Sequence, residues 1–261
     1  MYSIVPLDVG DLEMDRSQVV FGTMQGVVEA EKLIVYYIEG GSRRILVDTG
    51  PHSFEEKEGQ WYNFTPLIRA RQSKSQKLEN ALMDTVGITP KDIDLVILTH
   101  LHWDHAGQVD KFLNSEIIVS DVELNYAINP LPRAYKGYLA LQTGIIPPFV
   151  KAIKKIRTVK MKEKKVVEGI TVIPTPGHTP GSISVCVETS HGEYVITGDA
   201  VNSYENIKGD PKAGIKYHMI GIFSNQIEAW ESFEMIDEKV GYDHSKVLPG
   251  HDSTVFGKKY Y

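Results

Sequence analysis

Short apolar segments alternate with turn residues along the whole chain. Compact apolar runs that are bounded by turn signals are typical of strands. The chain has such runs at 33–38, 44–47, 95–98, 116–119, 169–174, 182–188, 193–197 and 246–248. The Gly40-Gly41 pair between the first two runs predicts a hairpin.

Helices are predicted where apolar residues recur every three or four positions, at 77–86, 121–127 and 226–240. Gly87 ends the first of these helices, and Ser120 can cap the second. In the third, four apolar residues lie at helical spacing: Ile227, Trp230, Phe233 and Ile236. Strands mixed with helices throughout indicate an α/β or α+β layered fold.

Two segments break this pattern. The segment 129–150 holds four prolines and several aromatic residues, and it can be either a surface insertion or the wall of a pocket. The segment 151–165 holds eight basic residues and one acidic residue, which is typical of a solvated face or a protected edge strand. We therefore expect a single domain over 1–261 with an insertion at about 121–165.

The composition excludes several classes of protein. With 42% hydrophobic and 24% charged residues, the 261-residue chain resembles an average soluble protein, and no apolar run is long enough to span a membrane. The first residues lack a basic segment followed by an apolar one, so we expect a cytoplasmic protein. A single cysteine, Cys186, excludes an intramolecular disulfide and a cysteine-rich metal site. The net charge of −6 argues against a nucleic-acid partner.

A dense group of potential metal ligands follows the predicted strand at 95–98. His100 and His102 point to the same side if the segment is extended, because side chains alternate along a strand. A turn near Asp104 can then carry Asp104 and His105 to the neighbouring side. Imidazole and carboxylate groups suit Zn²⁺, Fe, Mn or Co. The segment can therefore offer two ligand pairs to two adjacent points.

Three later turns supply further candidates. His178, Asp199 and His251 each lie just past a predicted strand and beside or near a glycine. Each of them alone would be read as an ordinary surface, turn or capping residue. Together with the first group they predict a metal site of five histidines and two aspartates. The four other histidines have no such context: His52, His191, His218 and His244.

These residues resemble the metallo-β-lactamase superfamily, whose signature is HxHxDH followed by a histidine, an aspartate and a histidine. The segment from His100 to His105 matches the first motif, and Asp48-Thr49-Gly50 resembles an early segment whose acid supports the site. The resemblance implies a four-layer αβ/βα sandwich with two metals at one edge, between two sheets. It assigns the ligands as His100, His102 and His178 for one metal, Asp104, His105 and His251 for the other, and Asp199 as the bridge.

Differences from the pattern narrow the choice within this superfamily. The β-lactamases have a cysteine ligand where this chain has Asp199, and we expect Cys186 to be a buried core residue. Oxygen-reducing diiron members have a glutamate at the position of His102. Glyoxalase II proteins add a helical C-terminal domain, whereas this chain ends ten residues after His251. The chain is most similar to the N-acyl-homoserine lactonase group.

The resemblance implies a dinuclear hydrolase that opens a lactone or a similar ester by attack of a metal-bound hydroxide. Zinc is the metal we expect, with Fe, Mn and Co as alternatives. Asp104 and Asp199 would be catalytic as well as ligands. The lactonase group has a tyrosine three residues after the bridging aspartate, where this chain has Asn202. Water, Asp199 and Tyr204 are therefore all candidates to protonate the leaving alkoxide.

Other functions stay open from the sequence. They are a thioester or phosphotriester hydrolase of the same fold, a mononuclear iron oxidoreductase of the persulfide-dioxygenase type, and a nucleic-acid-processing protein that uses 151–165. We expect the pocket walls to come from 129–150 and from the aromatic segment 61–64, although the latter can equally be core or a dimer contact. The oligomeric state is open, with a homodimer as a candidate.

Overall fold

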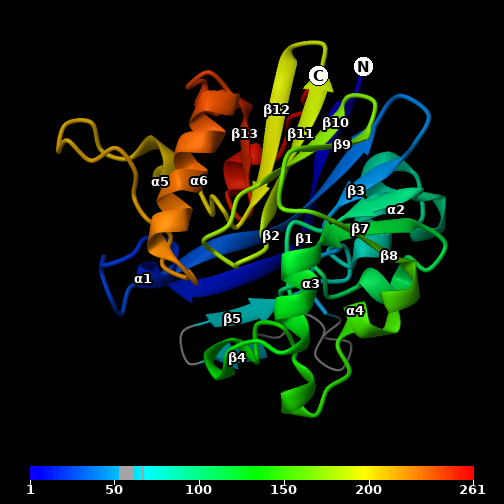
Figure 1. Ribbon diagram of the computed structural model, residues 1–261, viewed down its shortest axis with the longest axis horizontal. Coiled ribbons are helices and arrows are strands. Elements are labelled where there is room, and N and C mark those ends of the chain that lie inside the picture. Colours follow the sequence, from blue (N-terminus) through cyan, green and yellow to red (C-terminus); the bar gives the residue numbers. More distant parts are fainter. Residues whose placement is uncertain (53–61, 66–67) are drawn as a thin grey trace.

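The computed structural model describes residues 1–52, 62–65 and 68–261, and it shows two β-sheets with helices on both outer sides (Figure 1). The larger sheet has the strand order β4-β5-β1-β2-β3-β6-β7-β8, and the smaller has the order β13-β12-β11-β10-β9. The strands of the larger sheet are β1 (Ser3–Asp15), β2 (Val28–Glu39), β3 (Ile45–Val47), β4 (Tyr62–Thr65), β5 (Ile68–Arg71), β6 (Leu95–Ile97), β7 (Glu116–Ser120) and β8 (Ile156–Val159). Those of the smaller sheet are β9 (Lys164–Val167), β10 (Ile170–Pro174), β11 (Ile183–Thr189), β12 (Gly192–Gly198) and β13 (Val247–Pro249).

The central strands of both sheets, such as β3, β6 and β11, are buried on both faces, which explains their continuous apolar runs in the sequence. In β2, Tyr36 belongs to the core between the two sheets. Its neighbours Val35 and Tyr37 belong to a second core, which also contains residues of the helices α2 (Leu78–Val86) and α3 (Asp121–Ile128). On the smaller sheet, Cys186 packs in a third core with residues of α6 (Gln226–Lys239). Figure 1 shows α6 beside β13 of this sheet. The predicted four-layer sandwich is confirmed, and Cys186 is a core residue.

The predicted end of α2 and the predicted start of α3 are both found in the structure. Gly87 adopts the left-handed conformation with φ 70° and closes α2 through a hydrogen bond from its N–H to Met83 O. The side chain of Ser120 accepts from the N–H of Glu123 at the start of α3. Each predicted strand is also found, with ends that differ by a few residues.

The N-terminal strand was not predicted. β1 has 13 residues and pairs with β2 on one side and with β5 on the other, so it lies inside the larger sheet. Pro6 and Gly10 interrupt the apolar pattern of this segment, and the register shifts between Asp8 and Gly10. Both residue types are poor strand formers, which hides the strand from a pattern-based prediction.

The basic segment 151–165 lies along the edges of the two sheets. β8 is the last strand of the larger sheet, and β9 is the last strand of the smaller one. Arg157 pairs with Glu116, and Lys160 pairs with Asp121, on the neighbouring elements. This arrangement matches the protected-edge interpretation, because paired charges at an edge discourage pairing with another chain. The segment 121–165 thus runs from one sheet to the other.

The helical spacing of apolar residues in 226–240 correctly predicts α6, but not all of these residues face the core. Phe233 and Ile236 are fully buried against the smaller sheet, whereas Ile227 is 72% exposed and Trp230 is 37% exposed. α6 has 14 residues, and none of the helices in the described part of the chain is long and apolar enough to cross a membrane.

We predict that Phe233→Ala lowers the free energy of unfolding by about 3–5 kcal/mol, because it leaves a cavity between α6 and the smaller sheet. Ile227→Ala on the same helix is the matched control and changes it by less than about 0.5 kcal/mol. Urea unfolding followed by circular dichroism measures both values. Equal losses in the two variants would contradict this packing.

Candidate metal centre

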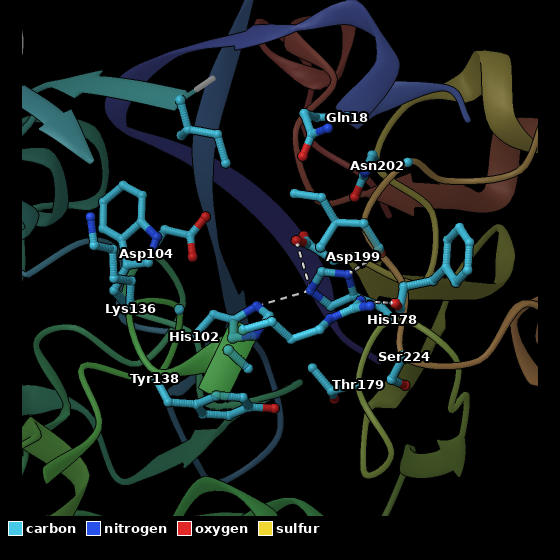
Figure 2. Close-up of a pocket in the computed structure, with 18 of the residues that line it drawn as sticks. Gln18, His102, Asp104, Lys136, Tyr138, His178, Thr179, Asp199, Asn202 and Ser224 are labelled. Carbon is cyan, nitrogen blue, oxygen red and sulfur yellow. Dashed lines mark hydrogen bonds and ion pairs between the residues drawn. The ribbon is translucent and has the colours of Figure 1, made fainter. Parts of the chain in front are cut away.

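A cavity of about 760 Å³ opens at one edge of the sandwich, and its residues come from distant parts of the chain (Figure 2). Its apolar wall includes Leu12 and Met14 of β1, Ile68 of β5 and Phe223. The insertion supplies a second wall between Leu131 and Tyr138, so the pocket-wall interpretation of this segment is confirmed. Of the predicted aromatic wall, Trp61 and the side chains of 62–64 lie outside the described residues.

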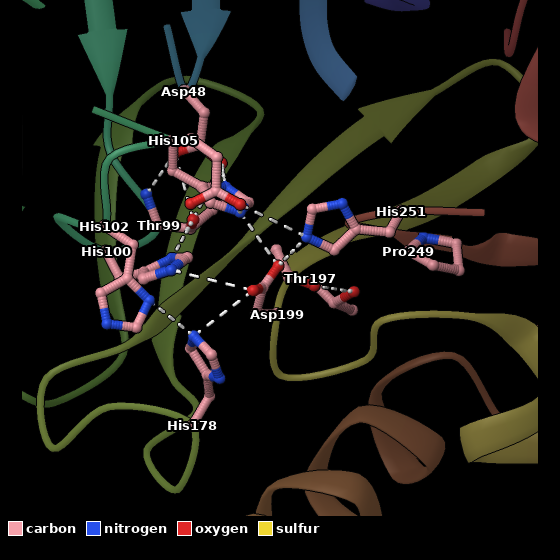
Figure 3. Close-up of polar contacts among 12 residues, drawn as sticks. Asp48, Thr99, His100, His102, His105, His178, Thr197, Asp199, Pro249 and His251 are labelled. Atoms are coloured by element: carbon pink, nitrogen blue, oxygen red, sulfur yellow. Dashed lines mark hydrogen bonds and ion pairs between the residues drawn. The ribbon is translucent and has the colours of Figure 1, made fainter. Parts of the chain in front are cut away.

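The seven predicted ligands lie close together, and five of them line the floor of this cavity: His102, Asp104, His178, Asp199 and His251. Figure 3 labels all of the ligands except Asp104, which Figure 2 labels. The ligands form two groups, and the candidate ligand atoms of each group lie within 4.8 Å of one another. The groups are His100, His102 and His178 on one side, and Asp104, His105, Asp199 and His251 on the other. Apart from Asp199, which the family resemblance assigns as the bridge, the two groups contain the same residues as the two ligand sets that it implies.

Asp199 lies between the two groups at the end of β12. Its Oδ1 is 3.0 Å from His105 Nε2 and 3.0 Å from His251 Nε2. Its Oδ2 is 3.3 Å from His178 Nε2 and 4.0 Å from His100 Nε2. One carboxylate therefore presents one oxygen atom to each group, which is the geometry that a bridging ligand needs.

Fixed acceptors orient three of the imidazoles. His105 Nδ1 donates to Asp48 Oδ2 at 2.8 Å, and Asp48 also accepts from Thr99 N at 2.8 Å. His178 Nδ1 donates to Ile222 O at 2.9 Å, and His251 Nδ1 donates to Lys32 O at 2.7 Å. Because the Nδ1 atoms are engaged, each Nε2 is directed into the site as a potential ligand.

The chemistry of the cluster fits a pair of divalent cations. The buried His100 Nε2 has no hydrogen-bond partner in the described part of the chain, and the nearer oxygen of Asp199 is 4.0 Å away from it. Buried polar atoms rarely lack a partner, so this nitrogen points to a missing one. Imidazole nitrogens and carboxylate oxygens suit zinc and related metals.

The electrostatics of the two groups differ. Burial and the neighbouring histidines lower the pKa of His100 and of His102 well below the ordinary value, so both rings are neutral near pH 7. Burial also opposes the charge on His251, but the carboxylate of Asp199 outweighs it and raises the pKa of His251 to about 9. In the metal-free protein, protonated His251 therefore supplies positive charge beside Asp199, where a metal ion would otherwise supply it.

Tyr204 does not reach the cavity. It begins the short helix α5 (Tyr204–Lys208), and its hydroxyl donates to Val247 O at 2.8 Å. Its ring packs against the core between the two sheets and against the core under α6. The prediction that Tyr204 can donate a proton to the leaving alkoxide is therefore wrong. Asn202 lines the cavity instead, is only 4% exposed, and its Oδ1 has no hydrogen-bond partner among the described residues.

Nothing in the sequence indicates Gln18 as a cavity residue, and within the predicted wall 129–150 nothing singles out Lys136. Gln18 lines the cavity from α1 (Arg16–Val19), and Lys136 lines it from the insertion (Figure 2). Gln18 follows the unrecognised strand β1, so no signal placed it near the ligands. Lys136 lies next to Gly137, which packs against the ring of His102 so closely that a Cβ would lie 3.2 Å from His102 Nε2. The close approach brings the insertion over the ligand cluster.

Comparisons with known proteins agree with this geometry. The model of the metallo-β-lactamase superfamily matches residues 35–251. An N-acyl homoserine lactonase of Bacillus sp. is 31% identical over 223 residues, which cover 83% of this chain and 80% of that protein. The chain therefore belongs to the metallo-β-lactamase superfamily, and the resemblance seen in the sequence is confirmed.

Solved structures of lactonases have the same fold. A substituted form of B. thuringiensis AiiA with N-decanoyl-L-homoserine at its active site is 26% identical, with a TM-score of 0.77. It is covered over 94% of its chain, and the match covers 97% of this chain. A second structure is an N-acyl homoserine lactone hydrolase with the product N-hexanoyl-L-homoserine at its catalytic metal centre. It is 25% identical, also with a TM-score of 0.77, and the match covers 97% of this chain and 94% of that chain.

We predict that Asp199→Asn lowers the pKa of His251 in the metal-free protein from about 9 to below its ordinary value of 6.5. Once the carboxylate is removed, burial is the dominant influence on this ring, and burial disfavours the charged form. NMR titration of the imidazole measures this change. Asp237→Asn, a buried carboxylate that contacts His244, is the control and leaves His251 unchanged. A pKa that stays near 9 in Asp199→Asn would contradict the assigned cause.

Proposed function

We propose that this protein is a dinuclear metal hydrolase that opens the ring of N-acyl-homoserine lactones or closely similar lactones. The observation that carries the proposal is the position of Asp199 between two ligand groups at the floor of a largely apolar cavity. Support comes from the lactonase relative, which is 31% identical, and from product-bound structures of the same fold.

We propose zinc as the metal, with the ligands divided as the two groups divide. His100, His102 and His178 would hold one ion, Asp104, His105 and His251 the other, and Asp199 would bridge them. Two divalent ions held there would acidify a water molecule near neutral pH and polarise a carbonyl oxygen of the substrate. Our proposal also includes a cytoplasmic location, whereas the homodimer stays a prediction.

The residues of the cavity suit a substrate with an apolar tail and a polar ring. Met14, Leu131 and Phe223 line the cavity and offer apolar surface for an acyl chain. Asn202 can donate a hydrogen bond from its Nδ2 to a substrate oxygen, since it lines the cavity beside His251 and Asp199. An amide cannot supply a proton, so the proton for the leaving alkoxide comes from water or through Asp199.

The test of the proposal is a substrate panel measured with the wild-type protein and with His105→Ala. We expect the wild-type protein to bind two metal ions and to release acid from N-acyl-homoserine lactones faster than it cleaves thioesters or phosphotriesters. His105→Ala should stay folded but lose metal and more than about 100-fold in kcat/KM, because losing a ligand costs more than losing a group that orients one. His191→Ala replaces an exposed histidine and is the control.

Lactone hydrolysis at the wild-type rate by metal-free His105→Ala would overturn the proposed mechanism. One bound iron with oxygen consumption, in place of two ions with acid release, would favour the oxidoreductase alternative.

A second prediction concerns pH. Metal binding must displace the protons that Asp199 holds on His105 and His251, so metal uptake should release protons and weaken as the pH falls. Metal affinity should therefore weaken progressively below about pH 9, and activity should decline with it, as measured by rate profiles at fixed metal concentration. A profile that is flat from about pH 8 to about pH 4 would contradict it.

A further inference from the structure

A buried carboxylate outside the ligand set lies behind the three-histidine group. Glu123 of α3 is 0% exposed, although glutamate is rarely buried completely. No lysine, arginine or histidine of the described residues forms an ion pair with it, and hydrogen-bond donors surround it instead. Burying a carboxylate without a cationic partner lowers the stability of a protein. The buried position of Glu123 therefore suggests a role in the neighbouring site.

The contacts of Glu123 lead to each histidine of that group. Its Oε1 accepts from the backbone N–H of Leu101 at 2.9 Å, and Leu101 stands between His100 and His102. Its Oε2 accepts from the hydroxyl of Thr179 at 2.7 Å, and Thr179 follows His178. One side chain thus joins the two loops that carry the three imidazoles.

A third contact extends to the wall of the cavity. The hydroxyl of Tyr138 donates to Glu123 Oε1 at 2.8 Å, and the ring of Tyr138 packs edge-on against His102 at a centroid distance of 4.6 Å. Figure 2 shows Tyr138 next to His102, in agreement with this ring contact. Through Tyr138, the carboxylate also restrains the face of His102.

The backbone around Glu123 is fixed to the same loop. The hydroxyl of Ser120 donates to Gly181 O at 2.6 Å, and its oxygen accepts from Glu123 N at 3.0 Å. Gly181 approaches so closely that an added Cβ would lie 2.1 Å from Glu123 N. The start of α3 and the loop after His178 are therefore in direct contact, and a side chain at position 181 would push them apart.

We propose that Glu123 is the positioning residue of the three-histidine group, and that its negative charge strengthens cation binding there. Asp48 orients His105 in the other group by direct contact, whereas Glu123 acts through Leu101, Thr179 and Tyr138. The inference rests on the proposed metal centre. A cation on the three histidines supplies the positive charge that the buried carboxylate otherwise lacks.

The test uses the metal-loaded full-length chain and the near-isosteric substitution Glu123→Gln. The hydroxyl of Thr179 can turn to accept from the new amide, because it also lies 2.6 Å from Ser182 Oγ. We expect a chelator to remove one of the two ions about 10- to 100-fold more readily than from the wild-type protein, while the other ion is retained. The absorption spectrum of the cobalt-loaded variant should change as well, because a coordinating ring moves.

Asp237→Asn is the matched control. Asp237 is another buried carboxylate, which accepts from the hydroxyl of Tyr217 at 2.6 Å and contacts His244 on the far side of the smaller sheet. It should retain both ions and the cobalt spectrum of the wild-type protein. A loss of metal in both variants would indicate general destabilisation and overturn the positioning role.

Further variants cover the case in which Glu123→Gln does not fold. Thr179→Val and Tyr138→Phe each remove one donor to Glu123 and keep the shape of the side chain. Each should weaken the same ion in the same direction by a smaller factor, and unchanged affinity in both would overturn the inference. A wild-type chain that binds no metal would instead overturn the proposed function, whereas a two-metal wild type with an equally tight Glu123→Gln overturns the role of Glu123 alone.

Discussion

The carboxylate of Asp199 is the group on which the rest of the site depends. Burial alone would raise its pKa, yet His105, His251 and His178 hold that pKa well below the usual value. A buried anion of this kind is tolerated only where positive charge surrounds it, whether from protons or from metal ions. Gly250 leaves the space for it, since a Cβ at that position would lie 2.7 Å from Asp199 Oδ1. The surrounding loops bring imidazoles to both of its oxygen atoms.

Two further buried carboxylates flank this centre without belonging to the ligand groups. Asp48 contacts His105 directly, and Glu123 fixes the two loops that carry the other group. The cavity above them joins a largely apolar wall to this charged floor. Low dielectric surroundings strengthen electrostatic interactions at the floor, and apolar surface above it favours a substrate with a hydrocarbon chain. The same arrangement therefore serves both binding and bond cleavage.

The grouping of the candidate ligands could be predicted from the sequence, because each of them follows an apolar run and the first four lie within six residues of the chain. The strand β1 could not, since Pro6 and Gly10 interrupt its pattern although pairing with β2 secures it. The role proposed for Tyr204 is wrong because the turn that begins at Ser203 starts a helix and directs the hydroxyl to Val247 O. Glu123 was missed because an acidic residue in the first turn of a helix is typical of capping, and only the tertiary structure shows its donors.

The most direct test of the central claim is anomalous X-ray diffraction from crystals of the metal-loaded protein. The account predicts two peaks on opposite sides of the Asp199 carboxylate, one bound by His100, His102 and His178 and the other by Asp104, His105 and His251. A single peak, or two peaks that do not share Asp199, would contradict it.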